Sequence, residues 1–213
     1  CGLYDASFKT FAVDPPRPGV QCRLCQSIER QRMQWYYLER YTDFFKSNEK
    51  RMLHFAPEKS LKPAFEKHFG GRYLSCDLEM PGVHLHFDIT AIPFTENVFD
   101  YILCCHVLEH IPDDTKAMAE LNRILRPDGV LIVMVPIEGE VTFEDPSVTD
   151  PAERKRLFRQ DDHVRIFGTD IVKRLKGVGF EVEALRPSDI CPDRVVEQMA
   201  LDPDEYLFAC RKP

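Results

Sequence analysis

The sequence has no long apolar run and no excess of positive charge. Its apolar stretches fall short of the ~20 residues that a helix needs to span a bilayer, and no secretory signal is recognisable. The 213 residues carry 28 Lys and Arg against 35 Asp and Glu, a formal net charge of −7. This balance disfavours general binding to nucleic-acid phosphates, which needs many basic contacts. We predict no membrane partner.

Glycine is missing where a nucleotide-binding α/β protein usually has it. The first strand-to-helix turn of such a protein is glycine-rich, because backbone N–H groups must approach a pyrophosphate. Here the apolar run 51–56 leads into His54-Phe55-Ala56-Pro57-Glu58. Pro57 suits the first turn of a helix but has no N–H to donate. The stretch therefore argues against a nicotinamide-dependent oxidoreductase.

The cysteines do not form the framework of a small secreted domain. Three lie near the N-terminus, and the other five are scattered, most of them in apolar runs that read as strands. Free cysteine commonly packs as a small hydrophobe. This usage indicates a reducing compartment, and we predict a cytoplasmic protein.

The N-terminal cysteines have the spacing of a metal knuckle. Cys22 and Cys25 form a Cys-x-x-Cys pair, and Cys1-Gly2 resembles the end of a second pair that begins upstream of Cys1. Two such knuckles hold a structural zinc ion. We predict Cys1, Cys22 and Cys25 as zinc ligands, with the fourth upstream. A redox pair and incidental cysteines are the alternatives, and the proline-rich surroundings argue against the redox pair.

Strands and helices alternate along most of the chain. A helix is predicted at about 27–46, and strands at 51–56, 72–78, 83–89, 99–107, 130–137, 180–185 and 205–212. Arg126-Pro127-Asp128-Gly129 is expected to be a turn that ends the helix before the fifth strand. The alternation predicts a mainly parallel sheet with helices on both faces. We assign 1–26 to a zinc-ribbon-like module, 27–47 to a connecting helix and 48–213 to the main domain.

Polar residues stand where successive predicted strands end. Asp77 ends the second strand, Asp88 the third and His106 the fourth. In a doubly wound sheet these ends meet near the switch point, where ligands bind. A carboxylate after the second strand can accept both ribose hydroxyls, and Asp88 followed by Ile89 can bond an adenine amino group and cover its ring. These positions predict a nucleoside site.

These residues lie in the first three of four longer motifs: SCDLE (75–79), FDITAIPF (87–94), FDYILCCHVLEHI (99–111) and LNRILRPDGVLIVMVP (121–136). Over about residues 51–137 the chain resembles the class I S-adenosylmethionine-dependent methyltransferases. The resemblance implies an α/β fold with a Rossmann-like, doubly wound sheet of seven strands, mainly parallel with the last strand antiparallel. It also implies methyl transfer from a sulfonium to a nucleophile.

The resemblance implies roles for particular residues. Asp77 would hold the ribose, Asp88 and Ile89 would frame the adenine, and His106 with Cys105 would line the floor near the methionine part. The whole predicted cofactor-binding set is Phe55, Ala56, Pro57, Glu58, Asp77, Leu78, Asp88, Ile89, Cys105 and His106.

The chain departs from the family at the first turn, where His54 replaces an acid and Ala56 the first glycine. S-adenosylmethionine has no phosphate and carries an ammonium, so Glu58 can be read as an acceptor for that ammonium. The alternative is that Glu58 is only an acid in the first turn of a helix.

The polar insertion 138–168 is expected to cover the active site. It contains Asp162, His163 and Arg165, which we predict to bind the substrate. His163 is a predicted general base, and His106 is its rival. Arg165 suits a carboxylate or phosphate. A solvated, internally paired loop is the alternative for the whole segment.

The predicted function is methyl transfer from S-adenosylmethionine to a small molecule. RNA is the alternative acceptor, because some ribosomal RNA methyltransferases also combine an N-terminal zinc module with this fold. A second alternative is a cofactor-binding module without transfer activity, suggested by the missing glycines. The sequence leaves the acceptor atom and the oligomeric state open.

Overall fold

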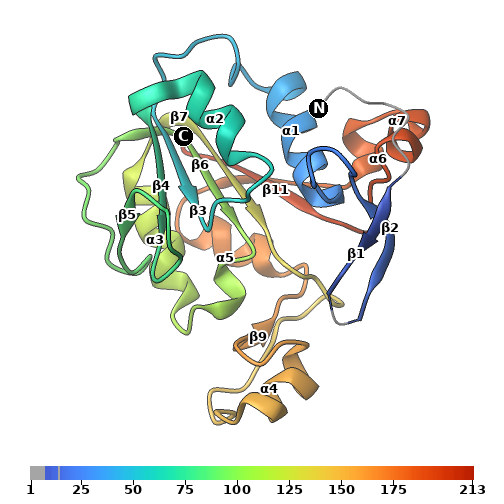
Figure 1. Cartoon of the computed structure of the whole chain (residues 1–213). Helices are drawn as coiled ribbons and strands as arrows, with labels where there is room; N and C mark the ends of the chain where they lie inside the picture. Colours follow the sequence, from blue (N-terminus) through green and yellow to red (C-terminus); the bar gives the residue numbers. More distant parts are fainter. Residues whose placement is uncertain (1–7, 14) are drawn as a thin grey trace.

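A seven-stranded sheet forms the centre of the protein (Figure 1). The structure is a computed structural model that describes residues 8–13 and 15–213. Across the sheet the order is β10-β11-β7-β6-β3-β4-β5. These strands are β3 (Met52–Phe55), β4 (Tyr73–Asp77), β5 (Leu85–His86), β6 (Phe99–Cys105), β7 (Leu125–Met134), β10 (Glu181–Leu185) and β11 (Leu207–Arg211).

The strand directions match the expected pattern. The pairs from β7 through β6, β3 and β4 to β5 are parallel, whereas β11 is antiparallel to both β7 and β10. The prediction of a seven-stranded, mainly parallel sheet with its last strand antiparallel is confirmed. The chain reverses its direction of winding between β3 and β6, so the switch point lies at the ends of these two strands.

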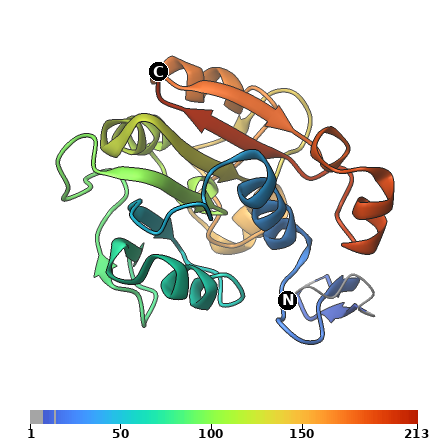
Figure 2. The same ribbon diagram turned by 90° about the horizontal axis from the view of Figure 1, so that it is seen from above.

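Helices cover both faces of the sheet (Figures 1 and 2). On one face Leu121 of α3 packs with Leu53 of β3, and on the other Leu38 of α1 packs with the neighbouring Met52. Adjacent strand residues thus enter opposite cores, which explains why these strands are apolar throughout. The helices are α1 (Glu29–Tyr41), α2 (Lys62–Phe69), α3 (Asp114–Ile124), α5 (Ile171–Gly177), α6 (Pro187–Ile190) and α7 (Asp193–Gln198).

The predicted turn at 126–129 is a bulge inside a strand. Helix α3 ends at Ile124 and β7 follows at once. The ladder to β6 pairs Phe99 with Leu125 and then Tyr101 with Val130, so the residues between them bulge outward. Asp128 there has a positive φ of 60°. Residues 126–129 were correctly predicted to turn the chain. Pairing with the neighbouring strands, however, continues β7 on both sides of this turn.

The N-terminal segment contains regular structure despite its Pro and Gly residues. Strands β1 (Lys9–Phe11) and β2 (Arg17–Gln21) form an antiparallel hairpin. Pro18 and Gly19 are tolerated because this two-stranded ribbon has no central strand. The Cys-x-x-Cys turn follows directly and leads into α1.

Arg32 of α1 fastens this segment to the rest of the molecule. Its guanidinium donates to the carbonyl groups of Val20 and Ser27 on one side, and of Met199 and Ala200 after α7 on the other. Burial lowers the pKa of Arg32 to about 10, although nearby Cys22 opposes this shift. Arg32 therefore remains charged near neutral pH. Its side chain joins the segment before α1 to the segment after α7.

The insertion forms a small unit below the sheet in Figure 1. It contains β8 (Phe143–Glu144), α4 (Pro151–Phe158) and β9 (Arg165–Ile166), with β8 and β9 antiparallel. Among residues 8–13 and 15–213, no helix combines the length and the apolar character needed to cross a membrane.

Candidate active site

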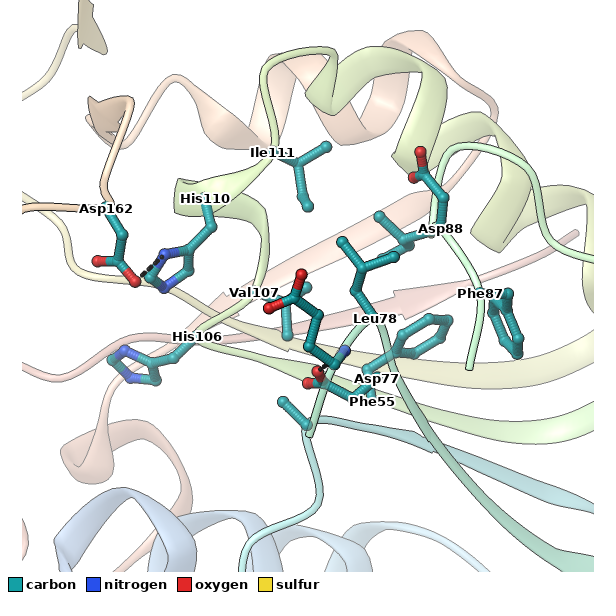
Figure 3. Close-up of a pocket in the computed structure, with 13 residues that line it drawn as sticks. Phe55, Asp77, Leu78, Phe87, Asp88, His106, Val107, His110, Ile111 and Asp162 are labelled. Atoms are coloured by element: carbon teal, nitrogen blue, oxygen red, sulfur yellow. Dashed lines mark hydrogen bonds and ion pairs between the residues drawn. The ribbon is translucent and has the colours of Figure 1, made fainter. Parts of the chain in front are cut away.

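A cavity of about 420 Å³ opens at the carboxyl ends of β3, β4 and β6 (Figure 3). This volume is within the range of roughly 300–1,000 Å³ typical of small-molecule sites. Asp77 and Asp88 lie at one end, and His106, His110 and Asp162 gather at the other. The cavity is therefore at the switch point, where the sequence predicted a ligand-binding site.

The two aspartates of this cavity are held by their own turns. Oδ1 of Asp77 accepts hydrogen bonds from the backbone N–H groups of Glu79 and Met80, at 2.9 and 2.8 Å. Oδ1 of Asp88 accepts from the N–H of Thr90 at 2.7 Å. These bonds fix both carboxylates and engage only one oxygen of each. The second oxygen is left to face a ligand.

Apolar side chains stand beside these carboxylates. Leu78 follows Asp77 and is 63% exposed, an unusual degree for a leucine at a cavity wall. Ile89 is buried, and the ring of Phe87 meets that of Phe55 edge-on at 6.0 Å. A flat apolar ring bound between these groups would cover Leu78.

The glycine-free turn keeps a backbone shape that normally favours glycine. Ala56 has a φ of +44°, and its N–H donates to the carbonyl of Cys76 at 2.9 Å. His106, at the end of β6, has a φ of +55° and donates its N–H to Met134. Left-handed backbone costs about 1–2 kcal/mol for a residue with a Cβ. Both switch-point strands therefore end in strained residues that line the cavity.

Glu58 is held inside the protein by neighbouring side chains. Its Oε2 lies 2.6 Å from Nε2 of His54, and its Oε1 accepts from the amide of Gln34 at 3.0 Å. The other His54 nitrogen lies 3.0 Å from the hydroxyl of Tyr73, whose pKa is raised by burial. A protonated Tyr73 can donate to Nδ1, which leaves Nε2–H to donate to Glu58. The chain of bonds joins β4, β3 and α1.

This arrangement changes the ionisation of Glu58. Burial alone would raise the pKa of this carboxyl, but the hydrogen bond and charge of His54, with the bond from Gln34, lower it overall. Neither Pro57 nor Glu58 lines the first cavity. Their predicted contact with a cofactor is therefore untested by this geometry and stays a prediction.

Cys105 is almost completely buried among apolar side chains on the α1 and α2 face of the sheet. Burial raises the pKa of its thiol well above the usual value, as it does for Cys104. Both are thiols near neutral pH, and Cys105 is not among the residues that line the cavity. Its predicted place near a methionine moiety stays a prediction.

A second cavity, of about 890 Å³, adjoins the first and shares His106 and His110 with it. Its walls come from the β1–β2 hairpin, the end of α4 and the segment before β11. It is lined by four basic residues (Arg17, Arg30, Lys155, Arg159) and six acidic ones (Glu109, Glu138, Asp161, Asp202, Asp204, Glu205). Burial raises the pKa of Glu205. The two cavities together offer a cofactor-sized space and a larger polar space.

The three predicted substrate residues occupy different places. Asp162 lines the first cavity, and its Oδ2 lies 3.2 Å from Nδ1 of His110. His163 is buried and lines neither cavity, and its ring meets that of His110 edge-on at 4.7 Å. Burial lowers the pKa of His163. His110 therefore stands between Asp162 and His163.

Arg165 is buried and is occupied by protein groups. It donates to the carbonyl groups of Leu108, Ile111 and Pro112 and pairs with Glu144 at 2.8 Å. Arg174 joins Glu144 and Asp114 in the same network. Most of the donors on Arg165 are thus engaged. These contacts agree with the internal pairing of the alternative interpretation, and the predicted binding of substrate by Arg165 stays a prediction.

The set of site residues predicted from the sequence leaves out Glu109 and His110, which line the second cavity. They lie in the short 3₁₀ helix η2 (Leu108–His110), directly after β6. The signal was the spacing His106-x-x-Glu109-His110, which places an imidazole, a carboxylate and a second imidazole within one turn. Glu79, Phe87, Val107 and Ile111 also line the first cavity, and all but Ile111 adjoin a residue that was predicted.

Comparison with known proteins shows similarity to methyltransferases over the central part of the chain. Residues 50–133 match a family described as a methyltransferase domain. The demethylmenaquinone methyltransferase of Staphylococcus haemolyticus (strain JCSC1435) is 38% identical over 56 residues, which are 26% of this chain and 23% of that protein. The aligned stretch thus spans less than a quarter of the relative's length.

Solved structures agree on the fold. An S-adenosylmethionine-dependent methyltransferase from Archaeoglobus fulgidus superposes with a TM-score of 0.55 at 13% identity, covering 85% of this chain and 94% of that one. A Haemonchus contortus phosphoethanolamine N-methyltransferase, solved with S-adenosylhomocysteine, gives 0.51 at 18% identity, covering 84% and 57%. Residues 50–133 thus resemble a methyltransferase domain, and the chain has the fold of these solved methyltransferases.

Proposed function

We propose that this protein transfers a methyl group from S-adenosylmethionine to a small molecule. The observation that carries the proposal is a pair of adjoining cavities at the switch point, one with two fixed carboxylates and the other larger and polar. His106 lines both of them. The arrangement suits a nucleoside cofactor on one side and an acceptor on the other.

The charges of the first cavity fit this cofactor. Among the described residues that line it there is no Lys or Arg, whereas Asp77, Glu79, Asp88 and Asp162 are all acidic. Such a lining is poorly suited to a pyrophosphate and well suited to a cationic sulfonium and ammonium. Asp77 would accept from the ribose hydroxyls, and Asp88 with Ile89 would bind the adenine edge and face.

His106 is the residue best placed to take a proton. When bound, S-adenosylmethionine supplies an electrophilic methyl group on a sulfonium. His106 lies between the two cavities, and its Nε2 has no hydrogen-bond partner in the described part of the chain. His163, the rival base, lines neither cavity. Proton acceptance by His106 at Nε2 is therefore the proposal, with positioning of the acceptor as the larger contribution.

A small acceptor is favoured over RNA by the second cavity. Carboxylates outnumber basic side chains on its walls, and the whole chain is acidic, so phosphate backbones gain little there. The name of the staphylococcal relative also specifies a small-molecule acceptor. RNA is the alternative, and protection of an RNA fragment by the protein at moderate salt would support it instead.

A single substitution tests the cofactor site. Calorimetric titration with S-adenosylhomocysteine should give a 1:1 complex, and Asp77→Asn should weaken it at least tenfold, since a hydrogen bond to a charged group contributes about 1.5–3 kcal/mol. The amide keeps Oδ1 for the turn. Asp145→Asn is the matched control, because Asp145 also accepts from its own turn but lies on the insertion surface.

The outcomes separate the functional classes. Binding of S-adenosylhomocysteine together with turnover of a small-molecule library supports the transferase. Binding without turnover of any small molecule or RNA would support the cofactor-binding module. Stabilisation by NAD alone would remove the proposal.

We also propose a structural zinc ion at the N-terminal knuckle. Neither Cys22 nor Cys25 is in a disulfide, and their side chains interact within one turn, where Gln26 has a positive φ of 62°. Both would be ligands, with Cys1, which lies outside the described residues. Metal analysis should find one zinc per chain, and a large loss in Cys25→Ser. Full zinc content in that variant would contradict the proposal.

A further inference from the structure

Glu109 is a buried carboxylate without hydrogen bonds. Its side chain is 1% exposed, and neither oxygen has a hydrogen-bond partner among the described residues. The imidazole Nδ1 of His106 lies 3.2 Å from Oε1. Buried carboxylates are normally hydrogen-bonded, paired with a cation or bound to a metal. The unpartnered oxygens therefore favour a bound cation beside Glu109.

His163 presents a free lone pair to the same space. Its Nδ1 lies 2.9 Å from the carbonyl oxygen of Phe158, and a carbonyl can only accept, so Nδ1 carries the proton. Nε2 then has the lone pair, and it is buried without a partner in the described part of the chain. A histidine fixed in this way by its other nitrogen is the usual form of a metal ligand.

His110 completes a group of three. One ligand atom from each of Glu109, His110 and His163 lies within 4.8 Å of the others. Nδ1 of His110 faces Asp162 at 3.2 Å, which leaves Nε2 for an ion and makes Asp162 the group that orients the ring. Figure 3 shows His110 and Asp162 side by side at this end of the cavity.

The backbone holds these side chains together. The N–H of Val164, next to His163, donates to the carbonyl of Glu109 at 2.9 Å. Arg165 donates to the carbonyl of Leu108 at 3.1 Å, at the start of the turn that carries Glu109 and His110. These two hydrogen bonds hold the insertion against η2 close to the three side chains. A metal site requires side chains that are held rigidly in this way.

We propose that Glu109, His110 and His163 bind one divalent transition-metal ion. Two imidazoles and one carboxylate suit Zn²⁺, Fe²⁺, Co²⁺ or Mn²⁺ better than Mg²⁺, which prefers oxygen ligands. Three protein ligands leave a position open for an exogenous oxygen. The ion neutralises Glu109 and occupies Nε2 of His163, which accounts for both unpartnered groups.

The position of the proposed metal site limits the chemical class of the methyl acceptor. Glu109 and His110 line the second cavity, and His110 also lines the first. An ion here would bind an oxygen of the acceptor, such as a hydroxyl or carboxylate, beside the cofactor. This part rests on the proposed function, whereas metal binding itself does not.

Manganese binding to the full chain tests the site. Titration with MnCl₂, followed by loss of the electron paramagnetic resonance signal of free Mn²⁺, should show one ion per chain. The cysteine knuckle does not interfere, because thiolates select softer ions. Glu109→Gln and His110→Asn should each weaken binding at least tenfold. His86→Ala removes an exposed imidazole on β5 and should leave binding unchanged.

Thermal unfolding separates a metal ligand from a structural residue. Without metal, Glu109→Gln should still fold, because the amide keeps the size of the side chain and an oxygen beside His106, so loss of metal binding in this variant is not a consequence of unfolding. Added Mn²⁺ should raise the midpoint of the wild type and not that of the variant. Absence of stoichiometric Mn²⁺ and Zn²⁺ binding outside the knuckle, or equal binding by Glu109→Gln, would overturn the proposal. S-adenosylhomocysteine binding, measured separately, reports on the proposed function.

Discussion

Glu58 shows how one residue of the first turn is used in this protein. The side chain read from the sequence as a possible acceptor for an ammonium is bonded to His54 and Gln34, and its predicted contact with a cofactor stays a prediction. It joins the strand end to helix α1, and Ala56, two residues earlier, lines the cavity. At the scale of the residue, the side chain of Glu58 holds the turn after β3 in place. The backbone of that turn forms part of the wall of the first cavity.

The ionisation of Glu58 leads to a prediction about pH. Because its pKa is lower in the folded protein than the ordinary value of about 4.3, its contribution to stability is present above that value and is lost as the pH falls through the folded pKa. Glu58→Gln should cost about 2 kcal/mol at pH 7, and the difference from wild type should shrink below about pH 4. Urea unfolding between pH 3 and 7 measures it.

A matched control lies on α2. Glu66 is partly exposed and pairs with Lys62 at 3.7 Å, so Glu66→Gln should change stability by less than about 0.5 kcal/mol at any of these pH values. If Glu58→Gln behaves like Glu66→Gln, the buried bonds of Glu58 contribute nothing.

Ala56 provides a second test at this scale. Its φ of +44° costs about 1–2 kcal/mol, and glycine would remove this strain while adding roughly 0.5–1 kcal/mol of unfolded-state entropy. Ala56→Gly should therefore stabilise the protein by about 0.5 kcal/mol in chemical unfolding. Ala117→Gly, in the middle of α3, should instead destabilise it by about 1 kcal/mol or more. Loss of stability in both variants would show that Ala56 is not strained.

At the scale of the element, the insertion 138–168 is held against η2 by buried Arg165. The guanidinium serves three carbonyl groups and a carboxylate. Arg165→Lys should destabilise the protein by about 3 kcal/mol, because an ammonium cannot reach the same acceptors and leaves buried groups unpaired. The measurement is urea unfolding at pH 7.

The exposed pair of Arg159 with Glu138 is the control. Arg159→Lys should cost well under 1 kcal/mol, since a surface ion pair contributes little. If Arg165 binds the substrate, as the sequence predicted, Arg165→Lys should weaken acceptor binding and leave stability unchanged. That result would contradict the structural role.

At the scale of the whole molecule, Arg32 joins the N-terminal hairpin to the segment after α7. Arg32→Met keeps much of the apolar stem and removes four hydrogen bonds to carbonyl groups. The hairpin should open more often, and limited proteolysis should cleave the N-terminal segment at least several-fold faster. Exposed Arg40 on the same helix gives the control, Arg40→Met, with unchanged cleavage.

The two cavities should respond differently to this change. The hairpin lines the second cavity through Phe11 and Arg17, but no described residue before β3 lines the first. S-adenosylhomocysteine should therefore bind Arg32→Met with wild-type affinity, as measured by calorimetry. A large loss of that affinity would show that the N-terminal segment also supports the first cavity.

The sequence by itself determined the sheet and the edge of the sheet at which a ligand is predicted to bind. Alternating apolar runs and amphipathic segments specify strands and helices, because burial of apolar faces dominates the fold. Asp77, Asp88 and His106 were located as strand-end residues, since parallel strands must end at one edge. The structure brings all three to one cavity.

Only the tertiary structure decided which polar side chains face that cavity and which face one another. Glu58 and Arg165 carry the same charges as ligand-binding residues, but their partners come from segments far away in the chain. Likewise, His163 meets Glu109 and His110 only because the insertion folds back onto η2. Periodicity reports burial along one element, whereas contacts between distant elements depend on how the whole chain packs.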